Sequence, residues 1–292
     1  MEIETAMPDR RVEPLGPDSL LWQYGFARAA LLVAGRALLL QVMHPVIGAG
    51  VRDFSDYKRD PWGRLDRTVL SLQIQMFGGD RAQAEADRLR HMHKEIRGIG
   101  FDGEHYSALN QGAYAWVHLS NFDTMLAFDR TFAHMLDADT REQLYAEWRQ
   151  IGRMLGIREE HMPENLTGLA TYVEDMIATT LTENPTARDV IESLSIRDVA
   201  APPWPMFPEV LWRALRPLGR TLLHDSVVGT LPAAVRSMLD LQWTASDERR
   251  LRAMAAAMRQ AGRHVPDRVM QYPMAYQAVK AAKHYRATQR AS

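Results

Sequence analysis

The chain has 292 residues, of which 46% are hydrophobic and 24% charged, and its formal net charge is -1. This balance fits a globular protein with a sizeable core, and without a block of Lys and Arg it argues against a nucleic-acid partner. The absence of cysteine excludes disulfides, thiolate-bound metals and covalent haem attachment. Any bound metal must therefore rely on the ten histidines, on carboxylates or on oxygen ligands.

The amino-terminal part predicts an extension followed by a buried helix. Residues 1–18 mix Glu, Asp, Arg and Pro without the apolar stretch of a secretory signal, so we expect an extension and a cytoplasmic location. Residues 20–51 are very apolar but interrupted, which favours a core helix over 19–43, ending at His44-Pro45, rather than a membrane-spanning helix. The interrupting residues are Arg28, Arg36, Gln41, His44 and Pro45.

The rest of the chain predicts an all-α fold. Apolar residues recur at helical spacing, and no strand-like alternation persists. Gly and Pro residues separate the predicted helices, and 201–208 is the stretch that most resembles a linker. Without repeats or low-complexity tracts, the pattern favours one irregular multi-helix domain over 19–286, with a short tail at 287–292. The expected helices are 19–43, 64–77, 81–97, 116–136, 140–155, 166–181, 208–223, 233–239 and 246–261.

The helix expected over 81–97 places one histidine on each of its two faces. Asp80 is the expected N-cap, and Gly98 is expected to end the helix in a left-handed conformation. His93 falls on the apolar stripe and is predicted to point inward, whereas His91 is predicted to point to water. The stripe is Ala82, Ala86, Leu89, His93 and Ile96.

A basic and hydroxyl-bearing group opens the preceding helix. Arg64, Arg67 and Thr68 stand at i, i+3 and i+4, so they share a helix face that can cover a polar or oxygen-binding pocket. The residues alone leave two plainer alternatives open. The arginines can form a solvated face paired with Asp60 and Asp66, and His93 can be a core histidine that donates to a backbone carbonyl.

Five motifs follow one another along the chain. They are Gln41-Val42-Met43-His44-Pro45-Val46-Ile47-Gly48-Ala49-Gly50-Val51, Arg64-Leu65-x-Arg67-Thr68, Phe77-Gly78, His93-x-x-Ile96-x-Gly98 and Trp116-Val117-His118. In their order and spacing these motifs resemble the oxygenase family of MpaB and the latex-clearing rubber oxygenases. The resemblance extends, more weakly toward the C-terminus, over most of residues 20–286.

This resemblance implies an all-helical, globin-like core that holds a non-covalent haem b, with His93 as the proximal iron ligand. Arg64, Arg67 and Thr68 would then lie on the distal side as catalytic residues, and Arg64 can also pair with a haem propionate. Arg67 stands where the rubber oxygenases have a Lys that ligates iron, and because a guanidinium does not normally coordinate iron, a Lys-capped state is excluded. No carboxylate matches the family's Glu base.

His44 and His118 are further candidates for cofactor binding. Either can line the haem pocket or hydrogen-bond to a propionate. The plainer alternative for His44 is a helix-end residue near terminal carbonyls. For His118, with Trp116 and Phe122 nearby, the alternative is a packed core histidine.

The resulting functional hypothesis is a haem-dependent oxygenase that uses dioxygen on an apolar alkene, isoprenoid or lipid-like molecule. Hydroxylation and peroxidase-like turnover would use the same residues. The alternative is a haem-binding or haem-free helical sensor or carrier. Non-haem iron on His44, His91 and His93 is disfavoured because His91 and His93 diverge on a helix. Residues 204–223 form an amphipathic stretch that suits peripheral membrane contact, or else ordinary core packing.

Overall fold

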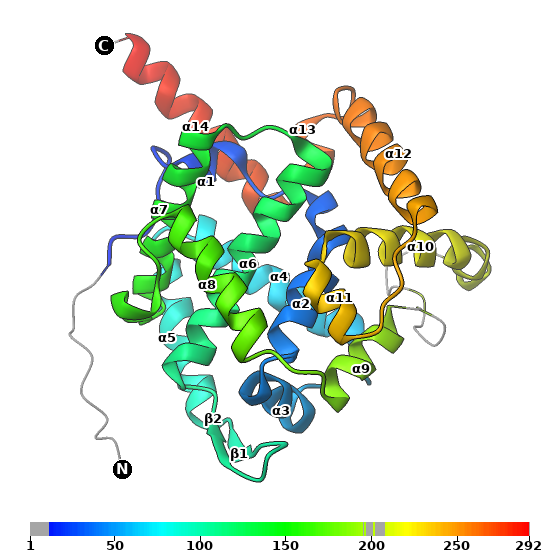
Figure 1. The fold of residues 1–292 in the computed structure, drawn as a ribbon. Coiled ribbons are helices and arrows are strands. Elements are labelled where there is room, and N and C mark those ends of the chain that lie inside the picture. The colour runs from blue at the N-terminus through cyan, green and yellow to red at the C-terminus, as the bar shows by residue number, and fades with distance from the viewer. Residues whose placement is uncertain (1–11, 195, 197–200, 202–207, 292) are drawn as a thin grey trace.

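Over the residues that the structure describes, the protein folds as one all-α domain with one small antiparallel β-hairpin, which confirms the predicted fold class (Figure 1). The computed structural model describes residues 12–194, 196, 201 and 208–291. Parts of the expected extension (1–11), of the linker-like stretch (202–207) and of the tail (292) lie outside the described residues.

The helix predicted over 19–43 is broken, and a second helix follows it. Short helix α1 (Leu20–Tyr24), a 3-10 turn (Arg28–Val33) and α2 (Ala34–Val42) replace it, and α3 (Pro45–Phe54) comes next. The sequence reading of His44-Pro45 as an end was incomplete: Pro45 is also the first residue of α3, where its missing N–H costs nothing. A Cβ at Gly48 would clash with the Val42 carbonyl oxygen, so glycine permits the sharp elbow.

Helices α4 (Pro61–Phe77) and α5 (Arg81–Lys94) form an antiparallel hairpin. Gly79 in the turn has φ 54°, a conformation that favours glycine. The predicted cap at Asp80 is wrong: its backbone is helical, whereas a capping side chain needs an extended residue, and it makes no capping bond.

The predicted stop at Gly98 is also wrong. Helix α5 ends at Lys94, and the chain then pairs β1 (Arg97–Ile99) with β2 (His105–Ser107). Gly98 lies in β1 opposite Tyr106 and does not have positive φ. Strand pairing with a later segment therefore replaces the last helical turn that the local pattern favours.

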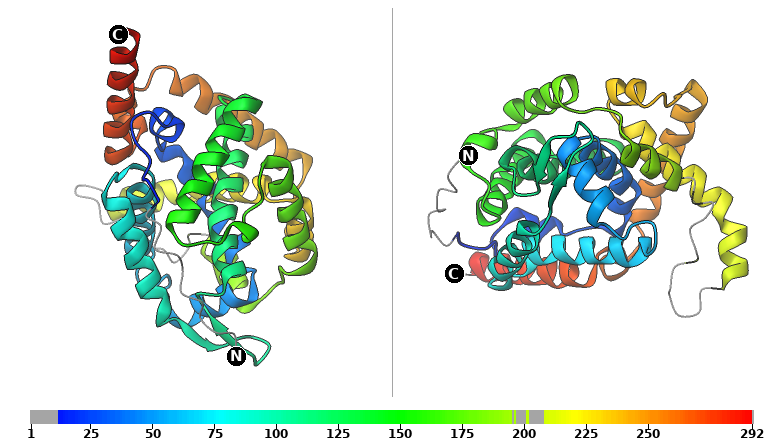
Figure 2. Two further views of the ribbon diagram at one scale, coloured as in Figure 1. Left: turned by 90° about the vertical axis from the view of Figure 1, so that its left-hand side faces the viewer. Right: turned by 90° about the horizontal axis from the view of Figure 1, so that it is seen from below.

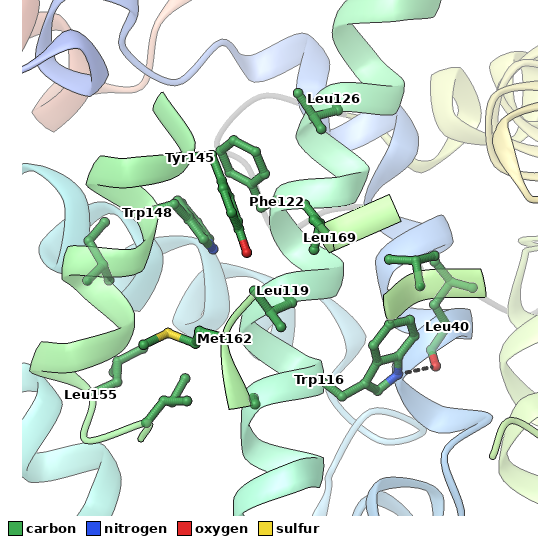
Figure 3. Packing of buried hydrophobic residues seen from close by; sticks show 14 of the residues in the cluster. Leu40, Trp116, Leu119, Phe122, Leu126, Tyr145, Trp148, Leu155, Met162 and Leu169 are labelled. Carbon is green, nitrogen blue, oxygen red and sulfur yellow. Dashed lines mark hydrogen bonds between the residues drawn. The ribbon is translucent and has the colours of Figure 1, made fainter. Parts of the chain in front are cut away.

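The centre of the domain is a layer of helices around α2 and α6 (Gln111–Phe128). Figure 3 shows Trp116 of α6 donating its indole N–H to the Leu40 carbonyl of α2, at 2.9 Å. Phe122 packs against Tyr145 and Trp148 of α7 (Ala138–Met154), with ring centroids 5.1 and 5.7 Å away. A π-helical turn (Asp129–Ala133) ends α6 earlier than predicted, and α8 (Leu166–Thr179) follows the 3-10 turn Glu159–His161.

The C-terminal third wraps this centre. It contains α9 (Pro185–Ser193), α10 (Glu209–Thr230), α11 (Ala233–Met238), α12 (Ala245–Gly262), α13 (Asp267–Met270) and α14 (Pro273–Ala291). Helices α9, α13 and α14 were not predicted. Helix α14 packs on α1 and α4, and its end projects beyond the body (Figure 2).

Within the described residues, no one helix combines the length and the apolarity that a membrane span requires. A bent pair, Arg28–Val42 with Pro45–Phe54, meets both requirements only when taken together, with 108° between its halves.

Candidate functional site

The α4–α5 hairpin brings Arg64 and His93 to the same end of the molecule. Arg64 precedes Gly79 by 15 residues and His93 follows it by 14, so an antiparallel pair places them opposite each other. A polar clamp holds the two helices: Ser71 of α4 donates to Glu85 of α5, and Glu85 forms a two-pronged ion pair with Arg88 at 2.7 Å.

His93 presents one engaged and one open ring nitrogen. Its Nδ1 lies 2.7 Å from the Leu89 carbonyl oxygen, a bond that makes Nδ1 the donor and leaves the lone pair on Nε2. Nε2 makes no hydrogen bond to the described part of the chain. Burial lowers the pKa of His93, and the positive charges of Arg64 and Arg88 lower it further. The hydrogen bond to the Leu89 carbonyl acts in the opposite direction, but the pKa remains below its ordinary value. The half-buried imidazole is therefore neutral near pH 7.

The inward position of His93 and the outward position of His91 are confirmed, because His91 is exposed. A residue that the sequence analysis missed completes the surroundings. The ring of Tyr114, in α6, meets the His93 ring edge-on at 5.5 Å and 80°. Burial raises the pKa of Tyr114 to about 12, so its hydroxyl stays protonated. The predicted helix began at Trp116, whereas α6 begins at Gln111, and this error in the boundary left Tyr114 outside it.

Arg64 and Thr68 interact as their spacing predicts. The Arg64 guanidinium donates to the Thr68 hydroxyl, which in turn donates to the Arg64 carbonyl at 2.9 Å. The side chain reaches solvent, yet protein surrounds it closely enough that desolvation lowers the pKa of Arg64, and the charge of Arg67 adds to this effect. Thr68 thus orients a guanidinium that repels positive charge at His93.

Arg67 points to a different partner. Its Nη1 lies 3.1 Å from Asp60, whose other carboxylate oxygen accepts the Gly63 amide at the start of α4. Both Arg67 and Asp60 are more than half exposed, so this is the surface pair that the plainer alternative describes. A contact between Arg67 and bound oxygen stays a prediction.

His44 is buried at the junction of α2 and α3. It is 8% exposed, and its Nδ1 has no hydrogen-bond partner in the described structure. Burial lowers the pKa of His44 to about 4, so the ring is neutral. An unpaired buried nitrogen is costly and calls for a ligand or a water molecule. Its assignment to cofactor binding stays a prediction that this geometry supports.

His118 has the contacts of a core histidine. It is 4% exposed and stacks on Trp148 at 4.9 Å. The two residues exchange hydrogen bonds: the His118 ring donates to the Trp148 carbonyl at 2.8 Å, and the Trp148 indole donates to the His118 carbonyl at 3.0 Å. The predicted role in cofactor binding is untested, and these contacts fulfil the plainer alternative.

The amphipathic stretch 204–223 is described only from residue 208 onward. Four aliphatic side chains at the start of α10 are exposed: Val210, Leu211, Leu215 and Leu218. Membrane contact through this stretch stays a prediction. Among the described residues, no group of three or more His, Asp or Glu side chains is placed to hold a metal ion.

The family described as "ER-bound oxygenase mpaB/B'/Rubber oxygenase, catalytic domain" matches the chain over residues 22–260. The matched range includes the α4–α5 hairpin, His93 and Tyr114. The chain belongs to this family. This membership confirms the family resemblance that the motifs indicated, and the family is one of oxygenases.

Two curated relatives are similar over most of their length. They are the uncharacterized proteins Rv2237 of Mycobacterium tuberculosis and Mb2261 of Mycobacterium bovis, each 22% identical over 245 residues, which cover 82% of this chain and 91% of each relative. No solved structure matches the chain significantly.

Proposed function

We propose that this protein is a haem-b-dependent oxygenase that uses dioxygen to oxidise an apolar alkene, isoprenoid or lipid-like molecule. The observation that carries the proposal is His93: a neutral imidazole whose Nδ1 is already engaged, close to the Arg64 cation, within an oxygenase family domain. A cytoplasmic location, with membrane contact through 204–223, belongs to the same proposal.

The residues fit this cofactor. Haem iron already has four porphyrin nitrogens and needs one imidazole from the protein, which His93 can offer through Nε2. The bond from Nδ1 to the Leu89 carbonyl fixes the tautomer and increases the basicity of Nε2. A part for the unpaired Nδ1 of His44 in holding the cofactor belongs to this proposal.

When bound, haem would supply the iron that binds and activates dioxygen. Arg64 would contribute a fixed positive charge that stabilises negative charge developing in the site, and Thr68 would hold its guanidinium in place. Tyr114 would restrain the plane of the His93 ring. Leu70 and Met92, on the same two helices, are 52% and 43% exposed and offer apolar surface for a substrate.

The test is oxygen uptake by haem-loaded protein with squalene as the apolar alkene, together with trapping of carbonyl products. Cleavage of one double bond by one dioxygen molecule gives two carbonyl groups, so uptake and carbonyl formation should match at one to two. Arg64→Gln should slow uptake about 100-fold, the loss typical for removing one charge-stabilising donor.

Arg81→Gln is the matched control, because it removes the same charge from an exposed position at the other end of the hairpin, and it should stay within about threefold of wild type. Equal rates in wild type and Arg64→Gln would contradict the assigned role of Arg64. Haem-loaded protein that consumes no oxygen with apolar alkenes would instead favour the sensor or carrier alternative.

A further inference from the structure

Helices α10 and α12 line a second candidate site, which involves neither His93 nor Arg64. They lie side by side at one edge of the molecule (Figure 1), and a cleft of about 520 Å³ opens along them. Its charged lining consists of Arg213, Arg216, Arg220, His224, Asp225 and Arg250. The cleft brings four guanidinium groups together around the Asp225 carboxylate. Two of them also pair with carboxylates beside the cleft, Arg213 with Glu209 and Arg250 with Asp247, so the formal charge of these side chains is 4 - 3 = +1.

The one carboxylate in the cleft is already committed. Asp225 is 2% exposed, and both of its oxygens accept from Arg250, at 2.8 and 2.9 Å. Arg250 also pairs with Asp247 on its own helix, at 2.6 Å. This network fixes Arg250 as part of the wall, and among the described residues neither Arg213 nor Arg220 bonds to Asp225.

The α10 arginines form a ridge along the cleft. Arg213, Arg216 and Arg220 are spaced three and four residues apart, so they share one helix face. Arg213 pairs with Glu209 one turn away, at 3.2 Å. Arg220 makes no hydrogen bond or ion pair with any residue that the structure describes. Like charges on one helix face destabilise the helix, so an anion that binds the ridge would relieve their repulsion.

Shape and chemistry both indicate a phosphate-bearing ligand. A concave site whose lining carries an excess of positive charge concentrates the positive potential, and the planar guanidinium donates two parallel hydrogen bonds to phosphate oxygens. The volume exceeds that of inorganic phosphate and lies within the range of sites for small organic ligands.

We propose that the α10–α12 cleft binds the phosphate group of a phosphomonoester, either a soluble ester or the headgroup of phosphatidic acid, with Arg220 and Arg213 as the contacting residues. The site stands on its own residues and does not rest on the oxygenase proposal.

The experiment measures binding at low ionic strength to two probes. Glycerol 3-phosphate, titrated by calorimetry, represents the soluble ester. Phosphatidylcholine vesicles with and without phosphatidic acid, separated by sedimentation, represent the headgroup. Saturable binding of glycerol 3-phosphate supports a soluble ligand, and tighter binding to vesicles with phosphatidic acid than to vesicles without it supports the headgroup. Equal binding to both kinds of vesicle, without binding of glycerol 3-phosphate, would overturn the proposal.

Two matched variants decide whether the cleft is responsible. Arg220→Gln should weaken binding about tenfold or more, the effect of losing one charge-assisted contact. Arg249→Gln removes the same charge from an exposed position of α12 outside the cleft, and it should leave binding within about twofold of wild type. Absence of binding to both probes, or an equal loss in the two variants, would overturn the proposal, and unchanged urea unfolding of Arg220→Gln would show that the fold is intact.

Discussion

The buried His118 predicts a specific loss of stability in acid. Burial lowers its pKa to about 4 from the ordinary 6.5, so the folded protein keeps the ring neutral while the unfolded chain takes up a proton. Between pH 6.5 and pH 4 the unfolded state binds more protons, and the free energy of unfolding therefore falls as the pH falls through this window. Above pH 6.5 both states are neutral at this residue and the effect vanishes.

The magnitude follows from the pKa difference. At about 1.4 kcal/mol per pH unit, His118 alone should cost the folded state about 2 kcal/mol on going from pH 7 to pH 5. The glutamine of His118→Gln cannot titrate, so this variant lacks the pH-dependent contribution of residue 118 to the free energy of unfolding. Its amide N–H replaces the ring N–H as a donor for the Trp148 carbonyl.

Urea unfolding followed by circular dichroism, at pH 7 and pH 5, provides the test. The wild type should lose about 2 kcal/mol more than His118→Gln over this range. Parallel losses in the two proteins would refute the account of a neutral, buried ring. Because its contacts are those of a core residue, His118→Gln should also retain haem binding.

Three further outcomes follow from single residues. Arg36 is 2% exposed and pairs with Asp123, so Arg36→Met should lower the free energy of unfolding by about 3 kcal/mol in urea titrations, and an unchanged midpoint would contradict a committed ion pair. Gly79→Ala, at φ 54° with open space around it, should cost about 1 kcal/mol through backbone strain alone, measured in the same titration. Leu215→Ser should weaken binding to phosphatidylcholine vesicles about tenfold, because it removes an exposed apolar side chain from α10. Met135→Ser, at a position that is 67% exposed and lies outside α10, should leave binding unchanged. Equal binding of the wild type and both variants would argue against membrane contact through α10.

The parts of the site that were predictable depend on helical periodicity. The 3.6-residue repeat correctly placed His93 inward and His91 outward, and the i, i+4 spacing correctly paired Arg64 with Thr68. These relations are local, so they survive errors elsewhere in the fold.

The parts that were missed depend on segments distant in the chain. Tyr114 reaches His93 from another helix, and only the folded arrangement shows that contact. The ion pair between Arg67 and Asp60 was predicted only as an alternative, because it depends on how the chain turns before α4. The predicted helix end at Gly98 was wrong because β2 pairs with the segment that the local pattern assigned to a helix.

The residues at helix boundaries were recognised, but their roles as helix starts or ends were wrongly assigned. Pro45 was assigned as a helix end because proline interrupts a helix, although it also occupies the first position of α3. Asp80 has the right side chain for a cap but the wrong backbone conformation. Residue type alone does not distinguish these cases, since φ and ψ depend on the neighbouring packing.

The most direct test of the central claim is the absorption spectrum and haem content of protein expressed with a haem precursor, for the wild type, His93→Ala and His91→Ala. The control substitution lies two residues away on the exposed face of the same helix. We expect a Soret band with about one haem per chain in the wild type and in His91→Ala, and its loss in His93→Ala alone. A folded wild type without haem, or haem retained at full occupancy in His93→Ala, would contradict the account.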